Sequence, residues 1–116
     1  MSYTAIKITT DKEVSEVTIG PNTLSDLQAC VGGWIESIEL SDGSTMYVNE
    51  EGRIHSLPFN SIASDVCGLN HLTHHMLLGI VGDVVVVGPL TPDGTDTDVT
   101  NKQRRFIERV RREAVL

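Results

Sequence analysis

The four consecutive valines at positions 84–87 constrain the fold more than any other feature of this sequence. β-Branched side chains are restricted at χ1, and they pack well on the pleated surface of a sheet. A run of them without alternating polar residues is typical of a strand that is buried on both faces. We therefore expect residues 81–88 to form the central strand of a sheet.

Shorter patterns predict the strands around this centre, and each is bounded by residues that favour turns. The predicted strands are residues 3–9, 14–19, 34–40 and 45–49, with a further candidate at 53–55. Asp42-Gly43 lies between the third and fourth of these and is typical of a two-residue hairpin turn. In that register Ile38 opposes Tyr47 and Glu36 opposes Asn49. In this register one face of the hairpin carries side chains from both strands, namely Trp34, Glu36, Ile38, Leu40, Tyr47 and Asn49.

Helix-start and helix-stop residues occur before and after the hairpin and again near the C-terminus. The first predicted helix is capped by Thr23 and ends at Gly32-Gly33, and the second is capped by Asn60 and ends at Gly68. A third is predicted over residues 70–78. The fourth is capped by Thr100 or Asn101 and runs to the C-terminus. The last has an apolar stripe of Phe106, Ile107, Val110 and Ala114. We therefore expect an α+β fold: a mixed, largely antiparallel sheet with a central Val-rich strand, short helices on one face, and a C-terminal helix.

The chain has 116 residues, which suits a single domain. We assign residues 1–100 to this α+β domain and residues 101–116 to a basic amphipathic helix that packs on it or on a partner copy. The net charge is −7, but the last sixteen residues carry +4, which leaves −11 for the rest. An acidic body repels phosphate backbones, so nucleic-acid binding is disfavoured except through residues 101–116.

The sequence also indicates where the protein acts. It has no apolar run long enough to cross a membrane and no signal peptide at its start, so we expect a cytoplasmic protein. In that compartment the two cysteines, Cys30 and Cys67, are expected to be buried, reduced thiols rather than a disulfide. The opposite charges of the body and the C-terminal helix favour a homo-oligomer.

Four short blocks of sequence resemble a family of small uncharacterised proteins of bacteriophages and actinobacteria, known as a domain of unknown function. The blocks are GGWIE with its preceding valine (31–36), MYVNEEG (46–52), LPFN (57–60) and IVGDVVVVG (80–88). The resemblance covers about residues 24–90, and the acidic segment (residues 90–100) and the basic helix lie outside it. It implies a phage or prophage origin, and the host cytoplasm as location, but no activity.

Two groups of side chains are candidate small-ligand sites. An aromatic platform beside a carboxylate and amides can stack a planar ligand and bind its edge, which predicts ligand binding at Trp34, Glu36, Tyr47, Asn49 and Asn60. Alternatively, these side chains fill the core and pair across strands. The second group is His71, His74 and His75, whose helical spacing would allow two of the imidazoles to share a metal, although the HExxH pattern is absent.

Basic residues of the C-terminal helix form a third candidate, an interaction surface made by Arg104, Arg105, Arg109 and Arg112. Other signals are weaker. The glycine of the acidic segment is not at the position that a calcium loop requires, and the final glutamate is missing, so we expect the segment to be solvated. No phosphate-binding glycine loop or nucleophile elbow is present, and no cation flanks either cysteine. We therefore expect no cofactor.

These observations favour a non-enzymatic phage accessory protein over an enzyme. It would bind a host protein, or sequester a small ligand such as a nucleotide signal, and so act as an inhibitor or decoy of a host or defence process. One alternative is a small metal-assisted hydrolase that uses His71, His74 and His75. Another is a nucleic-acid-associated regulator that acts through the basic helix.

Overall fold

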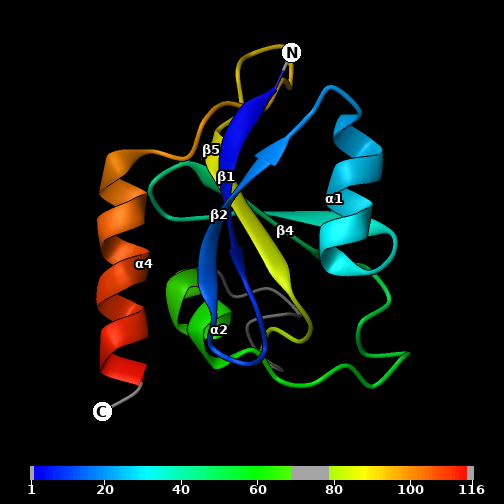
Figure 1. Ribbon diagram of the computed structural model, residues 1–116, viewed down its shortest axis with the longest axis vertical. Coiled ribbons are helices and arrows are strands. Elements are labelled where there is room, and N and C mark those ends of the chain that lie inside the picture. Colours follow the sequence, from blue (N-terminus) through cyan, green and yellow to red (C-terminus); the bar gives the residue numbers. More distant parts are fainter. Residues whose placement is uncertain (1, 69–78, 115–116) are drawn as a thin grey trace.

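The computed structural model describes residues 2–68 and 79–114, and it is built around a five-stranded antiparallel sheet (Figure 1). The order of the strands across the sheet is β2-β1-β5-β4-β3. The strands are β1 (Tyr3–Ile8), β2 (Val14–Ile19), β3 (Ile35–Glu39), β4 (Ser44–Asn49) and β5 (Val84–Pro89). The helices are α1 (Thr23–Val31), α2 (Ser61–Cys67) and α4 (Asn101–Ala114). The α+β fold predicted from the sequence is confirmed, whereas the helix predicted at 70–78 lies outside the described residues.

The central strand predicted from the valine run is β5. It pairs with β1 on one side and β4 on the other, so none of its edges faces solvent. Val84 and Val86 point to one face of the sheet and Val85 and Val87 to the other, and all four are completely buried. This double burial is the physical reason for a strand sequence without alternation.

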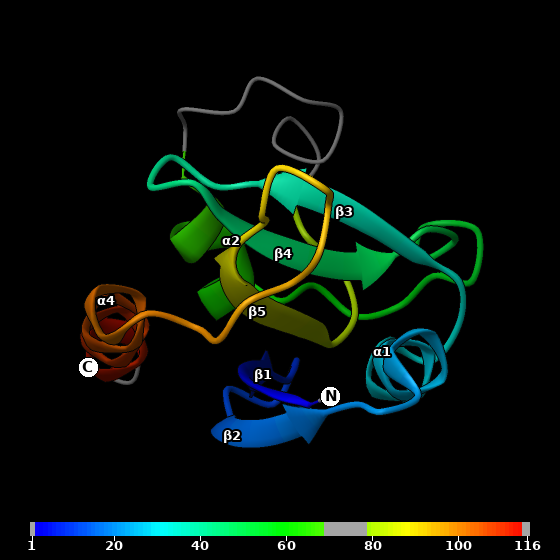
Figure 2. The same ribbon diagram turned by 90° about the horizontal axis from the view of Figure 1, so that it is seen from above.

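Helices cover both faces of the sheet, not the single face that we expected (Figure 2). α2 and α4 pack on the face of Val84 and Val86, which also contains Met46 and Ile107. α1 packs on the opposite face, where Leu27 covers Val85 and Val87 with their neighbours. We call these the α2–α4 face and the α1 face. A strand that is apolar on both sides requires a cover on both, so the valine run itself explains the second layer.

The register predicted for the hairpin of β3 and β4 is wrong by one residue. Ile38 opposes Met46, and Tyr47 opposes Ser37. The turn contains three residues, 41–43, because Leu40 N–H donates to Ser44 O at 2.7 Å and Gly43 adopts a positive φ of 90°. A three-residue loop that ends in a left-handed glycine is the other common hairpin connection. The slip moves every side chain of β3 to the other face relative to β4.

Two local predictions around the hairpin also require correction. Residues 53–55 form turns and not a strand, with His55 N–H donating to Glu51 O at 3.1 Å. Thr23 is the first residue of α1 rather than its cap; Asn22 occupies the cap position without a side-chain hydrogen bond. In contrast, the predicted cap at Asn60 is confirmed, because its Oδ1 accepts from Ala63 N at 3.0 Å.

The acidic segment is largely exposed, as expected, but parts of it are also held against the sheet. It crosses the end of the sheet between β5 and α4, as Figure 2 shows. Its first half is largely exposed, but Val99 is buried and its N–H donates to Thr4 O at 2.9 Å. Gly88 N–H donates to Thr97 O at 3.0 Å, an approach so close that a Cβ on Gly88 would collide with the carbonyl oxygen of Asp98. The segment is therefore part of the folded domain.

No helix in the described part of the chain is both long and apolar enough to cross a membrane. Cys30 and Cys67 are not joined, because they pack on opposite faces of the sheet. Cys67 is buried as expected, and Cys30 is half-buried. Burial raises the pKa of both thiols, so neither is an activated thiolate.

Candidate functional site

The five residues predicted to form a ligand site on the hairpin do not come together in the structure. Because the register differs by one residue, Tyr47 and Asn49 lie on the α1 face of the sheet, whereas Glu36 lies on the α2–α4 face. Trp34 precedes β3 and is 62% exposed. Only Tyr47 of this group lines a cavity on the α1 face.

The two asparagines of the predicted site hold the backbone together. Asn49 Nδ2 donates to Val31 O at 3.1 Å, and its Oδ1 accepts from Glu51 N at 2.8 Å. Asn60 Nδ2 donates to Ile8 O at 3.0 Å and to Gly82 O at 2.8 Å, in addition to its cap bond. Both side chains are buried and use their hydrogen-bonding groups within the chain. They connect loops and strands, and neither lines the cavity that Tyr47 lines.

The predicted metal site cannot be placed, because His71, His74 and His75 lie outside the described residues. Across residues 2–68 and 79–114, no three His, Cys, Asp or Glu side chains are grouped so that they could hold a metal ion. The metal-assisted hydrolase therefore stays a prediction.

The four arginines of the predicted interaction surface on α4 do not form one continuous surface. Arg104 is bound to β2, where its Nη2 lies 2.7 Å from Glu16 Oε1, and Arg112 is exposed near the end of the helix. Arg105 and Arg109 line a groove on the α2–α4 face. α4 itself is part of the core through Ile107 and Val110. Removing the helix would consequently unfold the domain, so its surface has to be tested by point substitutions.

Two tyrosines and one aspartate form an unexpected cluster on the α1 face. Tyr47 Oη donates to Asp96 Oδ1 at 2.6 Å, and Tyr3 Oη donates to the other carboxylate oxygen, Oδ2. Tyr3 begins β1, Tyr47 lies on β4, and the central strand β5 separates them. Asp96 reaches both because the acidic segment crosses the end of the sheet. The carboxylate therefore joins two strands that are not neighbours.

The environment keeps both phenols in their neutral, hydrogen-bond-donating form. Burial, and secondly the bond to Asp96, raise the pKa of Tyr3 well above its ordinary value. The same two causes, in the same order, raise the pKa of Tyr47. Neither phenol can act as a base or a nucleophile near neutral pH. The cluster is thus equipped for binding rather than for proton transfer.

A cavity of about 650 Å³ opens beside this cluster, between α1, the sheet and the acidic segment. We call it the tyrosine cavity. Its apolar wall is formed by Leu24, Leu27 and Ile35, of which Leu24 is 56% exposed. Its polar wall combines Asp96 and Asp98 with hydroxyl and backbone groups. The full lining is Ser2, Tyr3, Thr23, Leu24, Leu27, Ile35, Tyr47 and residues 94–98.

The charge of the tyrosine cavity is negative. Two carboxylates line it, and no Lys, Arg or His is among the lining residues. Asp98 Oδ1 accepts from Thr4 N at 2.8 Å, and both oxygens of Asp96 accept from a tyrosine. Each carboxylate oxygen has lone pairs for a further donor. An apolar wall opposite a wall of acceptors suits a ligand with an apolar body and a cationic or donor group.

Sequence reasoning found Tyr47 but missed Tyr3, Asp96 and Leu24. The available signal was indirect: the chain has only two tyrosines, and the acidic segment is rich in aspartate. Nothing in a sequence pattern links Tyr3 to a side chain 93 positions away. The aromatic and carboxylate combination that we expected on the hairpin does occur, but with other partners.

Together these features define a small α+β domain that carries a ligand-sized cavity at one end of its sheet. The chain belongs to the family described as a domain of unknown function (DUF3846), which it matches over residues 1–112. This match extends beyond the four blocks noted in the sequence and includes the acidic segment and most of α4. Neither a curated protein nor a solved structure matches the chain.

Proposed function

We propose that this chain is a non-enzymatic binding protein that sequesters a small organic cation in the tyrosine cavity. The observation that carries the proposal is the Asp96 carboxylate, which is held by two phenols in a cavity whose opposite wall is apolar. A preorganised carboxylate needs no rearrangement when a cation arrives, so the ordering cost of binding is small.

The chemistry of the cavity supports an ammonium or guanidinium ligand with a planar or apolar body. The body would lie against Leu24, Leu27 and Ile35, and the cationic group would donate to Asp96 and Asp98. The two tyrosine rings would provide aromatic surface for cation–π contact. A free nucleotide is disfavoured here because its phosphates would face two carboxylates.

The protonated state of the tyrosines and cysteines, all of which lie in the described part of the chain, supports binding over catalysis. The pKa values of both tyrosines and both cysteines are raised, so these groups are protonated at neutral pH. The resemblance of the four sequence blocks to phage proteins supports an accessory role during infection. In that role the protein would lower the concentration of its ligand in the host cytoplasm, as a decoy does.

The test measures binding of three probes of similar shape by isothermal titration calorimetry: benzylammonium, benzyl alcohol and benzoate. We expect benzylammonium to bind one per chain, benzyl alcohol to bind about tenfold or more weakly, and benzoate not to bind. Equal binding of the amine and the alcohol would mean that the cavity recognises only the ring. No binding of benzylammonium up to millimolar concentration would contradict the proposal.

Variants assign the binding to the cavity. Asp96→Asn preserves shape but removes the charge, and it should weaken benzylammonium about tenfold or more. Asp11→Asn removes the same charge from the exposed turn after β1, and it serves as the matched control. Leu24→Lys places a cation at the mouth of the cavity on an exposed position, so it should abolish binding without unfolding the protein. Unchanged affinity in both cavity variants would place the ligand elsewhere.

A further inference from the structure

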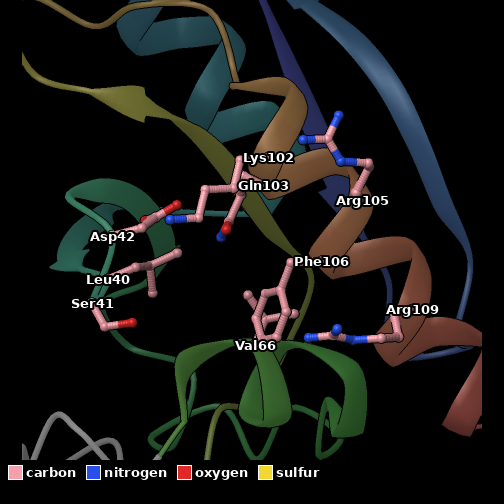
Figure 3. Close-up of a pocket in the computed structure, with 9 residues that line it drawn as sticks. All are labelled: Leu40, Ser41, Asp42, Val66, Lys102, Gln103, Arg105, Phe106 and Arg109. Atoms are coloured by element: carbon pink, nitrogen blue, oxygen red, sulfur yellow. The ribbon is translucent and has the colours of Figure 1, made fainter.

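The α4 groove is a second hollow, on the face of the sheet opposite to the tyrosine cavity. It has a volume of about 450 Å³ and lies between α4, α2 and the turn of the β3–β4 hairpin (Figure 3). Its floor is apolar, made by Leu40 and Val66 together with the ring of Phe106. Its lining is otherwise polar: Ser41, Asp42, Lys102, Gln103, Arg105 and Arg109.

Gln103 is the most informative side chain of this groove. The residue is only 4% exposed, yet its amide makes no hydrogen bond within the described part of the chain. In Figure 3 the amide points from α4 into the groove, between Leu40 and Phe106. The amide atoms are not among the fully buried polar atoms that lack a partner, so they reach the open space of the groove. Its donor and acceptor are therefore open to a ligand in the groove and are not used by the fold within the described residues.

Three cations line the groove together with this amide, at positions that share one side of α4. Lys102, Arg105 and Arg109 form no ion pair within residues 2–68 and 79–114, whereas Arg104 and Arg111 of the same helix are paired with Glu16 and Glu108. Figure 3 shows Lys102 extending toward the hairpin turn and Arg109 lying beside Phe106, while Arg105 at the rim is turned outward. The Arg109 guanidinium carbon lies 5.4 Å from the centre of the Phe106 ring.

The single carboxylate of the groove, Asp42, offsets only one of these three cations, and two more carboxylates, Asp65 and Glu113, line a neighbouring hollow with Arg109. Asp42 is engaged in its own turn, where Oδ1 accepts from Ser44 N at 2.9 Å and Oδ2 accepts from Ser44 Oγ at 3.1 Å. The groove is therefore locally positive in a chain of net charge −7. A local excess of positive charge attracts an anion to this part of a chain that is acidic as a whole.

We propose that the α4 groove binds a nucleoside phosphate. The phosphates would lie between Lys102 and Arg109, as charge-assisted partners. The base would lie on the apolar floor of Leu40, Val66 and Phe106, and the Gln103 amide would bind its edge. An amide offers one donor and one acceptor side by side, which matches the edge of a nucleobase. This site is independent of the tyrosine cavity and does not rest on the function proposed for it.

Three probes separate the parts of the proposed ligand: ADP, adenosine and inorganic phosphate. We expect ADP to bind one per chain in calorimetry, and adenosine and phosphate each to bind about tenfold or more weakly, because each lacks half of the contacts. Raising the salt concentration should weaken ADP more than adenosine. If phosphate binds as tightly as ADP, the groove is a simple anion site and the nucleotide assignment is wrong.

The decisive variant is Gln103→Met, which keeps the volume and removes the amide. It should leave the free protein about as stable as the wild type in urea, because the amide makes no hydrogen bond within the described residues, and it should still weaken ADP about tenfold. Arg109→Ala should weaken both ADP and phosphate, whereas Arg112→Ala, an exposed position outside the groove, is the matched control. Unchanged ADP affinity in Gln103→Met and Arg109→Ala, or no binding of ADP to the wild type, would overturn the proposal.

Discussion

The ionisation of the two tyrosines provides a direct measurement of the site on the α1 face. The chain contains no other tyrosine, so the tyrosinate absorbance reports Tyr3 and Tyr47 alone. Burial and the bond to Asp96 raise both pKa values above the ordinary value of 10.0. In the folded wild type we therefore expect no tyrosinate at the pH where a free tyrosine is half ionised.

The substitution Asp96→Asn separates the two causes. A hydrogen bond to a charged group contributes about 1.5–3 kcal/mol, against about 1 kcal/mol for a neutral pair. The difference of about 1 kcal/mol corresponds to a fall of about 0.7 pKa unit for the phenol that donates to the remaining carbonyl oxygen, since one unit equals about 1.4 kcal/mol. The other phenol faces the new NH2 group and loses its acceptor, so its pKa should fall further. Because burial is the larger cause and remains in the variant, both values should still lie above 10.0. Asp11→Asn should leave the titration unchanged.

The same shifts determine how stability depends on pH. Each pKa is raised in the folded state, so above pH 10.0 the tyrosines ionise more readily in the unfolded chain. This ionisation stabilises the unfolded chain relative to the folded chain. The stability contribution of the two phenols is complete below that pH and is lost as pH rises beyond it. The loss is at most about 1.4 kcal/mol per tyrosine and pH unit, and smaller after solvent screening.

Urea unfolding at neutral pH and about one unit above the ordinary tyrosine pKa measures this loss. The double variant Tyr3→Phe with Tyr47→Phe has no phenol to ionise, so it should lose less stability over that interval than the wild type does. A wild-type titration near pH 10.0, with the protein still folded, would refute the cluster of two tyrosines and Asp96. Equal losses in both proteins would refute the linkage argument.

Three further substitutions, the first with a matched control, test other parts of the structure. Asn60→Ala should cost about 3 kcal/mol or more in urea unfolding, because it leaves two buried carbonyls without their donor, whereas Asn22→Ala, at a cap position without a side-chain bond, should cost less than about 0.5 kcal/mol. Gly88→Ala should displace the acidic segment, which would lower both tyrosine pKa values toward 10.0 and destabilise the protein by about 1–3 kcal/mol; a wild-type tyrosine titration in this variant would contradict the packing. Trp34→Phe should change stability by less than about 0.5 kcal/mol and leave benzylammonium binding unaltered in calorimetry. Weakened binding would instead support the ligand site that the sequence predicted on the hairpin.

Local patterns predicted the fold where the physical cause is local. The valine run indicates a strand buried on both sides, and the cap at Asn60 depends on a residue three positions away. The hairpin register failed because Asp42-Gly43 suits a two-residue loop, whereas the chain uses a three-residue loop with Gly43 in the left-handed region. Both loops are compatible with the same dipeptide, and the choice depends on which faces the sheet buries.

The tyrosine cavity could not be predicted in this way, because it depends on long-range packing. Tyr3 and Asp96 are 93 positions apart, and they meet only because β5 places the acidic segment over the ends of β1 and β4. Composition identified this segment as polar, and polarity alone predicts solvation. A sequence pattern could not reveal that Gly88 leaves room for Asp98 to approach the strand.

The structure divides the chain into a scaffold and a recognition part. The asparagines in two of the four sequence blocks, Asn49 and Asn60, use their amides on backbone carbonyls and N–H groups within the chain. In contrast, Asp96 and Gln103 can still bind a further partner, and both lie in the stretch that follows β5. The first half of this stretch lines the tyrosine cavity, and the second half lines the α4 groove. Val99 is buried between them and bound to β1, so the two halves of this stretch are anchored separately. It follows that ligand chemistry can change in either half through surface substitutions while the sheet stays intact, and that the two sites should bind their ligands without coupling.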